Sequence, residues 1–210
     1  TGGEPLVKRN ILSICRRIAA VNGIREVCMT TNGILLPALA VPLREAGVTR
    51  LNISLDTLDR KKYAYITRGG ALDDAWAGIE AALSAGFQKV KLNAVLIGGF
   101  NDEEIAALAE LTKQYPLDVR FIEMMPIGLG KAYQGSMQEV IQKNLENIYG
   151  AAKPDSGAVR GNGPAVYWEF PGFQGKIGFI SAISHKFCKD CNRIRMTAEG
   201  FVKPCLQFAQ

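Results

Sequence analysis

The hydrophobic pattern of the chain alternates between two periods, one typical of buried strands and one typical of amphipathic helices. Short apolar runs rich in β-branched residues predict strands at 26–31, 50–56, 89–96 and 117–125. Apolar residues that recur every three or four positions predict helices at 6–21, 38–46, 59–67, 73–85 and, with Asn101 as N-cap, after residue 101. Four strand–helix repeats of this kind predict an α/β fold with parallel strands.

The pattern changes after Pro126. A helix is expected at 137–148, and short strands around a cysteine-rich hairpin are expected at 166–170, 176–180, 194–197 and 201–203. We therefore divide the chain into residues 1–126, a parallel α/β part, and residues 127–210, a C-terminal region. In parallel α/β folds the chemistry gathers at the carboxyl ends of the strands, so we expect the site at that edge.

Composition narrows the class of protein. The chain is 48% hydrophobic and 21% charged, which is typical of a soluble globular domain. It has no apolar run of about 18 residues and no signal-peptide pattern, so we predict a cytoplasmic protein with no membrane partner. The net charge of +5 is scattered and not interleaved with aromatic residues, so no nucleic-acid partner is predicted. Two of the cysteines, Cys15 and Cys28, lie among apolar residues and are interpreted as core thiols.

The other three cysteines form a candidate metal site. Cys188, Cys191 and Cys205 are spaced C-x2-C-x13-C, a spacing at which a tight turn and a returning hairpin can bring three thiolates together. The spacing leaves two interpretations open: zinc with His185 as fourth ligand, or an iron–sulfur cluster with one iron left open for a ligand. An odd cysteine count with a CxxC pair favours a reducing compartment over a disulfide framework.

Three further groups are candidates for ligand binding. Arg193 and Arg195 are two apart on an expected strand, so they point the same way and could clamp a phosphate chain; two solvated arginines are the alternative. Lys91 shares a strand face with Asn93, where a buried lysine is costly unless it is paired; a lysine at the solvent edge is the alternative. The segment 1–5, TGGEP, precedes a helix and is either a plain turn or a backbone nest followed by a carboxylate that receives an amino group.

Taken together, these segments resemble one family. They are TGGEP, TTNG, LNISLD, KLNAVLIGGFND, FIEMMPIG and GFISAISHKFCKDCNRIRMTAEGFVKPCL. The set is similar to the radical S-adenosylmethionine (SAM) enzymes of molybdenum-cofactor biosynthesis, the GTP 3′,8-cyclase family. The resemblance runs from Thr1 to about Leu206. The last segment is the specific one, since GGEP alone indicates only the radical SAM superfamily.

The resemblance implies an incomplete parallel (β/α)6 TIM-like barrel with a 4Fe–4S cluster at each end. The first cluster, on a CxxxCxxC loop, cleaves SAM, and the resulting radical starts the conversion of GTP to a cyclic pyranopterin precursor. The auxiliary 4Fe–4S cluster, on three cysteines, binds guanine through its open iron. The implied reaction is that of a lyase, with a separate pyranopterin synthase downstream.

The resemblance also implies roles for individual residues. Those that would contact SAM are Gly3, Glu4, Ser54 and Met125. Those that would face GTP are Thr30, Lys91, Arg193, Ile194 through its backbone, and Arg195. The implied ligands of the auxiliary cluster are Cys188, Cys191 and Cys205.

The chain departs from the family pattern at its ends. It contains no CxxxCxxC, and it begins at the GGEP, so we interpret it as a fragment that lacks the first strand and the segment carrying the SAM-cleaving cluster. We expect such a fragment to be inactive alone and to leave a sheet edge unpaired, which predicts low stability or association, for example into a homodimer. Two alternatives are another radical SAM enzyme with an auxiliary cluster, and a zinc-stabilised α/β module that binds a nucleotide.

Overall fold

The computed structural model describes residues 3–87, 89–125, 138–155, 163–185 and 191–205. The helices are η1 (Pro5–Val7), α1 (Ile11–Ala19), α2 (Leu36–Glu45), α3 (Arg60–Ile66), α4 (Leu72–Ser84), η2 (Asp102–Glu104), α5 (Ile105–Gln114) and α6 (Gln138–Tyr149). The strands are β1 (Cys28–Thr31), β2 (Arg50–Ser54), β3 (Lys89–Leu96), β4 (Asp118–Glu123), β5 (Lys153–Pro154), β6 (Val166–Glu169), β7 (Ile177–Ile180), β8 (Arg195–Met196) and β9 (Val202–Lys203).

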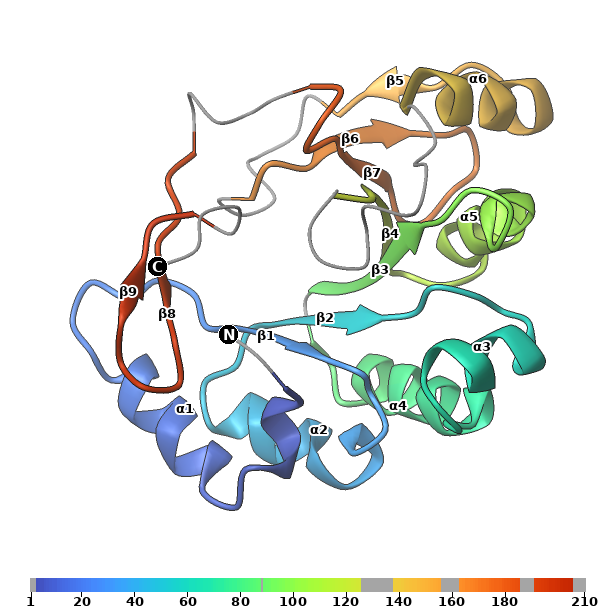
Figure 1. The fold of residues 1–210 in the computed structure, drawn as a ribbon. Coiled ribbons are helices and arrows are strands. Elements are labelled where there is room, and N and C mark those ends of the chain that lie inside the picture. Colours follow the sequence, from blue (N-terminus) through green and yellow to red (C-terminus); the bar gives the residue numbers. More distant parts are fainter. Residues whose placement is uncertain (1–2, 88, 126–137, 156–162, 186–190, 206–210) are drawn as a thin grey trace.

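The described strands form one large, mostly parallel sheet. Its order is β1-β2-β3-β4-β7-β6-β5, with seven strands. Neighbours from β1 to β7 pair in parallel, whereas β6 and β5 add to β7 as antiparallel strands. The helices lie along the outer face of the curved sheet (Figure 1). This arrangement confirms the predicted parallel α/β architecture, in the form of an open sheet.

Alternation along the strands separates an apolar outer face from a polar inner face. Leu51 and Ile53 of β2 and Val119 of β4 point outward and are fully buried. They pack with buried residues of the covering helices into one hydrophobic core. Phe121 of β4 and Phe179 of β7 extend this core, with ring centroids 6.1 Å apart. The residues between them in sequence face the inner side, which is therefore the side available to a ligand.

The helix expected at 6–21 is replaced by two shorter elements. The Glu4 side chain accepts a hydrogen bond from the Leu6 N–H, and Pro5 occupies the first helical position, so the chain begins a 3-10 turn. The backbone N–H of Lys8 closes that turn on the Pro5 carbonyl, in an extended conformation that ends η1. A new helix, α1, begins at Ile11, with Cys15 buried as predicted.

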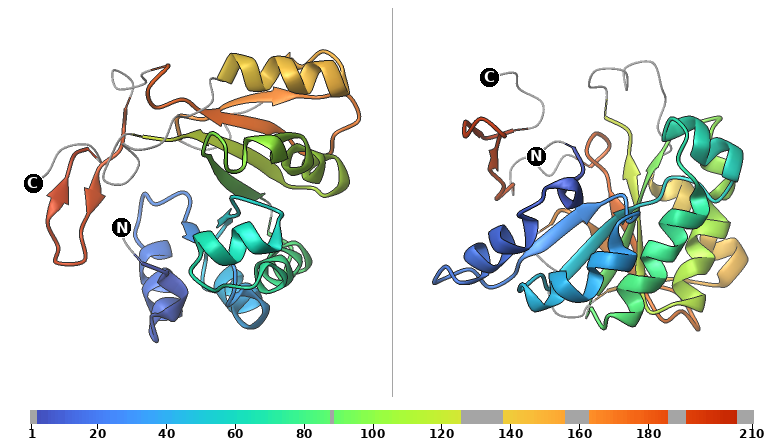
Figure 2. Two further views of the ribbon diagram at one scale, coloured as in Figure 1. Left: turned by 45° about the vertical axis from the view of Figure 1, so that its right-hand side comes forward. Right: turned by 90° about the horizontal axis from the view of Figure 1, so that it is seen from below.

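The short strands expected after Pro126 divide between two sheets. β6 and β7 join the large sheet, whereas β8 and β9 pair only with each other among the described residues. The β8–β9 hairpin projects from the body of the molecule on the side of the N-terminal residues (Figure 2). Among the described helices, none is both long and apolar enough to cross a membrane.

Candidate functional site

A row of polar side chains crosses the inner face of the sheet. In β4, Arg120 donates from Nε to Asn93 Oδ1 and from Nη2 to Asn52 Oδ1, both at 2.8 Å. Asn52 in turn donates from Nδ2 to Thr30 Oγ1 at 3.3 Å. The parallel register places Thr30 beside Asn52 and Asn93 beside Arg120, so the row follows directly from strand pairing. Thr30, a predicted GTP residue, therefore belongs to one network with Arg120.

Lys91 lies in the floor of this face. Its side chain is 1% exposed. Its Nζ donates to Tyr167 Oη at 2.6 Å and lies 3.8 Å from the Asp118 carboxylate. It also lies 4.6 Å from the centroid of the Tyr167 ring, a cation–π distance. The interpretation of Lys91 as a lysine at the solvent edge is wrong, and the requirement that a buried lysine be paired is met.

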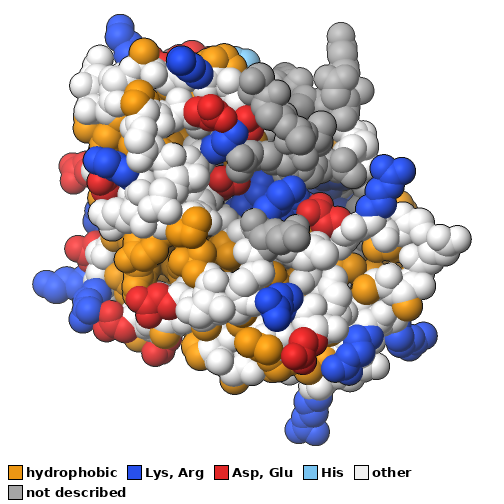
Figure 3. Space-filling view, turned by 180° about the vertical axis from the view of Figure 1, so that it is seen from behind, with side chains coloured by type: hydrophobic (Ala, Val, Ile, Leu, Met, Phe, Trp, Pro, Cys, Tyr) orange, Lys and Arg blue, Asp and Glu red, His pale blue; other side chains and the backbone are white. Residues whose placement is uncertain are grey.

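The inner face carries an accumulation of positive charge. Burial lowers the pKa of Arg120, and the nearby Arg50 lowers it further, while Tyr167 and Asp118 act in the opposite direction. Arg50 pairs with Glu26 at 2.8 Å. A half-buried cation such as Arg120, destabilised by desolvation and by a second cation, gains from an anionic ligand. Seen from behind, Lys and Arg side chains gather in a hollow at the middle of the molecule (Figure 3).

Gly178 of β7 makes room for these groups. A Cβ at this position would lie 2.8 Å from Tyr167 Cε1 and 2.9 Å from Arg120 Cγ. Both distances are too short for a real side chain. The Tyr167 ring and the Arg120 stem can therefore pack against β7 at this position only because residue 178 is a glycine.

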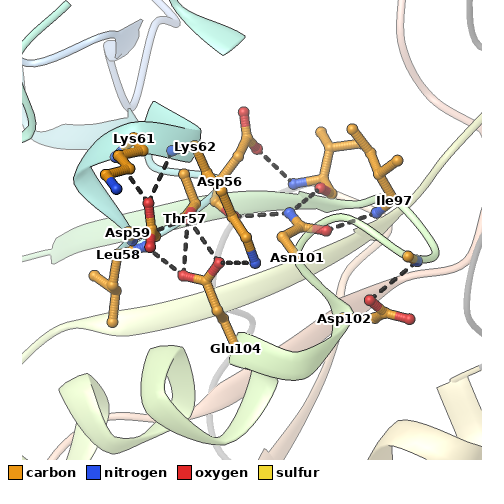
Figure 4. A network of polar contacts seen from close by, with 12 residues as sticks. Asp56, Thr57, Leu58, Asp59, Lys61, Lys62, Ile97, Asn101, Asp102 and Glu104 are labelled. Atoms are coloured by element: carbon orange, nitrogen blue, oxygen red, sulfur yellow. Dashed lines mark hydrogen bonds and ion pairs between the residues drawn. The ribbon is translucent and has the colours of Figure 1, made fainter. Parts of the chain in front are cut away.

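A second polar network organises the carboxyl ends of β2 and β3 (Figure 4). Asn101 is fully buried and donates to the Asp56 and Val95 carbonyls at 2.7 and 2.9 Å, while it accepts from the Ile97 N–H at 2.8 Å. Asp56 accepts from the Val95 N–H, and burial raises the pKa of Asp56 despite that bond. The predicted SAM residue Ser54 is exposed just before this network. The network thus fixes the strand end that presents Ser54.

Asn101 stands at the predicted N-cap position, before η2, but its side chain does not act as a cap. Its side chain makes no capping hydrogen bond to the helix that follows. A backbone turn at residues 97–101 brings it under the end of β2 instead, where two carbonyls and an N–H need partners.

The GGEP segment is held against the end of β1 by Glu4. Its Oε1 accepts from the Leu6 N–H at 3.0 Å and from Thr31 Oγ1 at 2.7 Å, and its Oε2 accepts from the Asn32 N–H at 2.8 Å. Gly3 is exposed and has a φ of +67°, a left-handed conformation that favours glycine. Met125 lies half-buried two residues beyond β4. Gly3, Ser54 and Met125 are thus found near strand ends or the turn beside them, and their contact with SAM stays a prediction.

The cysteine region is described in part. Cys188 lies outside the described residues, Cys191 is exposed, and Cys205 is half-buried. Hydrogen bonds from the backbone and side chain of Arg193 lower the pKa of the Cys191 thiol, which favours the thiolate that ligates metals. Within the described part of the chain, no group of three His, Cys, Asp or Glu residues is placed to hold a metal. Because Cys188 is not among those residues, the predicted trio is not tested.

The segment that leads into the CxxC is tied to β4. Glu123 Oε2 accepts hydrogen bonds from the Ile183 and Ser184 N–H groups at 2.8 and 3.0 Å. His185 is the residue that would be the fourth ligand if the metal were zinc. Its imidazole lies 3.0 Å from the Glu139 carboxylate of α6. Beyond the CxxC, Arg195 begins β8, and Arg193 and Ile194 come just before it. Arg193 and Arg195 are half-buried, and Ile194 is exposed.

Cys28 is not the core thiol that the sequence predicts. It is exposed on the inner face at the start of β1, and its Sγ lies 2.7 Å from Arg50 Nη2. Its neighbours in sequence, Val27 and Met29, pack against the hydrophobic core on the other side of the strand, because strand side chains alternate.

Sequence reasoning missed several residues of the inner face. They are Asn52, Asp118, Arg120 and Tyr167. A signal for the first three exists, because polar residues stand at alternate positions of consecutive strands, and parallel pairing aligns them. No local pattern identifies Tyr167, because its place depends on the antiparallel pairing of β6 with β7.

The fold and this face define an open, partial-barrel α/β protein with a cation-rich inner surface. Two family models match the chain: Radical SAM superfamily over residues 1–112 and Molybdenum Cofactor Synthesis C over residues 117–210. The chain belongs to the radical SAM superfamily. Membership implies SAM and a 4Fe–4S cluster as cofactors.

Two curated relatives show which members of the superfamily this chain is similar to. The chain is 49% identical to the GTP 3′,8-cyclase of Heliobacterium modesticaldum, over 100% of this chain and 65% of that protein. It is 48% identical to the GTP 3′,8-cyclase of Moorella thermoacetica, over 98% of this chain and 64% of that protein. The chain thus spans a little under two thirds of the length of these relatives.

Solved structures show the same fold. A domain of a pyruvate-formate lyase-activating enzyme from Bacteroides vulgatus matches with a TM-score of 0.56 and 19% identity, over 70% of this chain and 89% of that one. A radical SAM methyltransferase from Sphaerobacter thermophilus matches with a TM-score of 0.54 and 21% identity, over 70% of this chain and 45% of that one.

Proposed function

We propose that this chain is the GTP-binding and auxiliary-cluster portion of a GTP 3′,8-cyclase, a radical SAM lyase of molybdenum-cofactor biosynthesis. The observation that carries the proposal is the cation-rich inner face, where the buried Lys91 and the half-buried Arg120 both lie next to Tyr167. Such a face suits a polyphosphate. Relatives that carry the cyclase name match this chain over nearly its whole length.

The face would hold GTP as follows. Lys91 would supply charge from the buried floor, where electrostatic interactions are strong, and Arg120 would supply charge from its half-buried position. Thr30 supplies a hydroxyl at the opposite end of the same polar row. Arg193, Arg195 and the backbone of Ile194 would approach the nucleotide from the β8–β9 side. Guanidinium groups suit phosphate oxygens because they donate two parallel hydrogen bonds.

The residues of the chain also fit the two cofactors. Gly3, Glu4, Ser54 and Met125 would contact SAM, and the position of Ser54 at the carboxyl end of β2 agrees with the usual place of ligands in parallel α/β folds. The auxiliary 4Fe–4S cluster would be held by Cys188, Cys191 and Cys205, a soft thiolate set that suits iron–sulfur clusters. When bound, SAM and its own cluster supply the radical that begins the rearrangement of GTP.

The rest of the assignment is part of the same proposal. It comprises the division at residue 126, a second cluster on a segment outside this chain, a cytoplasmic location, homodimer formation, and a pyranopterin synthase that takes the product. We propose neither a nucleic-acid nor a membrane partner.

The proposal is tested by titrating GTP into the chain after anaerobic reconstitution with iron and sulfide. We expect Arg193→Ala to weaken GTP binding by about 1.5–3 kcal/mol, as for a charge-assisted hydrogen bond. Lys143→Ala, which removes an exposed cation of α6, is the matched control and should bind GTP like the wild type. Equal affinity of wild type and Arg193→Ala, or no binding by the wild type, would remove GTP from the assignment.

A further inference from the structure

Tyr167 connects the two parts of the chain at the centre of the inner face. It belongs to β6, within the region matched by the second family model, whereas Lys91 belongs to β3, within the first. The tyrosine is 8% exposed, so its side chain is buried. Its hydroxyl lies 2.6 Å from Lys91 Nζ, across 76 residues of sequence.

The same side chain lies next to two cations, the buried Lys91 and the half-buried Arg120. Lys91 donates to the hydroxyl and also lies over the ring. Arg120 lies beside Tyr167, since a Cβ at Gly178 would touch both side chains, and its charge lowers the pKa of the phenol. Tyr167 therefore holds the ammonium of Lys91 directly and packs beside the stem of Arg120, whose guanidinium is held by Asn93 and Asn52.

Tyr167 adds no negative charge beside these cations, whereas the Asp118 carboxylate lies 3.8 Å from Lys91 Nζ. Burial raises the pKa of Tyr167, and this effect outweighs the lowering by Arg120, so the phenol stays neutral at physiological pH. A second carboxylate in the place of Tyr167 would add to the charge of Asp118 and weaken the attraction for an anion. A neutral acceptor that fixes Lys91 beside Arg120 leaves more of their positive charge for a polyphosphate.

We propose that Tyr167 is a positioning residue of the phosphate site, which sets Lys91 and Arg120 for a nucleoside triphosphate. This inference rests on the proposed GTP-binding function and adds a residue to it. Tyr167 acts through the two cations, and Gly178 provides the space in which it does so.

Tyr167→Phe tests the proposal because it removes the hydroxyl and keeps the ring over Gly178 and under Lys91. Affinities for GTP and GMP are measured on the reconstituted chain by competition with a fluorescent GTP analogue. We expect GTP affinity to fall about five- to tenfold, the effect of one lost hydrogen bond, and GMP affinity to change much less. The gain in affinity from the added phosphates should therefore shrink in the variant.

Tyr149→Phe is the matched control. Its hydroxyl donates to the Ala106 carbonyl at 3.1 Å, between α6 and α5, so this variant also loses one tyrosine hydrogen bond. It should bind GTP and GMP like the wild type. A general loss of stability would affect both variants and both nucleotides alike, whereas a positioning role affects only Tyr167→Phe and chiefly GTP.

Gly178→Ala provides a second variant that removes no polar group. Its added Cβ must displace the Tyr167 ring and the Arg120 stem, so it should also lower the ratio of GTP to GMP affinity. If both variants keep the wild-type ratio, the role of Tyr167 is wrong while GTP binding stands. If the wild type binds no GTP, both the role and the proposed function are overturned.

Discussion

At the scale of single residues, buried side chains that satisfy backbone groups matter as much as those that face a ligand. Asn101 shows this, because its amide pairs with two carbonyls and one N–H at the ends of β2 and β3. Strand ends cannot satisfy these groups within the sheet ladder. One fully buried asparagine therefore stabilises the edge that carries the predicted SAM contacts.

We predict that Asn101→Ala lowers the free energy of unfolding by about 3 kcal/mol, since buried polar groups lose their partners. Urea denaturation of the chain measures this change. Asn147→Ala, at an exposed position of α6, is the control and should stay within about 0.5 kcal/mol of wild type. Equal midpoints for the two variants would show that water replaces the amide without cost.

The sequence predicts single residues well where local pattern determines their environment. Lys91 lies between apolar neighbours in a clearly predicted strand. The sequence therefore limits its side chain to two places, the inner face of the sheet or the solvent edge. The roles of Asn101, Cys28 and Tyr167 could not be predicted in the same way. Each depends on which distant backbone or cation lies opposite, and strand periodicity alone does not specify that partner.

At the scale of elements, Glu104 joins the start of α5 to the start of α3. Its carboxylate accepts from the Leu58 N–H at 2.7 Å, from Thr57 Oγ1 at 2.8 Å and from Lys62 Nζ at 3.0 Å. Asp59 caps α3 in the same network by accepting from the Lys61 and Lys62 N–H groups (Figure 4). The first turn of α3 is therefore fixed from two sides.

This junction gives the stability a pH dependence. Burial raises the pKa of Glu104, but the hydrogen bonds from Leu58, Lys62 and Thr57 outweigh it and leave the pKa lowered. A lowered folded-state pKa stabilises the fold above the unfolded value of about 4.3, and that contribution disappears as the pH falls through the folded pKa.

We predict that Glu104→Gln destabilises the chain by about 1–3 kcal/mol at pH 7 and that this difference shrinks as the pH falls below about 4. Denaturant unfolding at a series of pH values measures it. Glu103→Gln, at the neighbouring exposed position, is the control and should show a small difference at every pH. A constant difference for Glu104→Gln down to acid pH would contradict the assignment of the effect to its ionised carboxylate.

Element boundaries follow the sequence where strong end signals exist. β3 is found at 89–96 as predicted, between the turns at Gly86 and at 98–99. β5 was not predicted, because a two-residue strand containing Pro154 has no periodicity and forms only by pairing with β6. The predicted pattern for 6–21 did not reveal the break at Lys8, which comes from the Glu4 and Pro5 contacts of η1.

At the scale of the whole molecule, one sheet runs through both regions matched by the family models. β3 pairs with β4 over six residue pairs, and β4 pairs in parallel with β7. The sequence predicts the parallel strands but not this last step, since α6, β5 and β6 intervene between β4 and β7. The pairing of β7 beside β4 is what brings Tyr167 over Lys91.

A shared sheet and core predict that the described parts unfold together. The chain has two tryptophans, Trp76 in α4 and Trp168 in β6, so each reports on one of the two matched regions. Trp168→Phe breaks no hydrogen bond among the described residues, because the buried Trp168 Nε1 has no partner there. Trp76→Phe loses one hydrogen bond, to Glu80 at an exposed position. Both variants should therefore keep the fold.

We expect the fluorescence of each single-tryptophan variant to change at the same urea concentration as its far-ultraviolet circular dichroism, as in a two-state transition. The core that contains Phe121 and Phe179 spans both regions, so neither can lose its packing without exposing the other. Adding GTP to the reconstituted chain should move both fluorescence midpoints together. Separate midpoints for Trp76 and Trp168 would mean that the β4–β7 pairing is too weak to couple the regions, and Tyr167 could then not hold Lys91 in place.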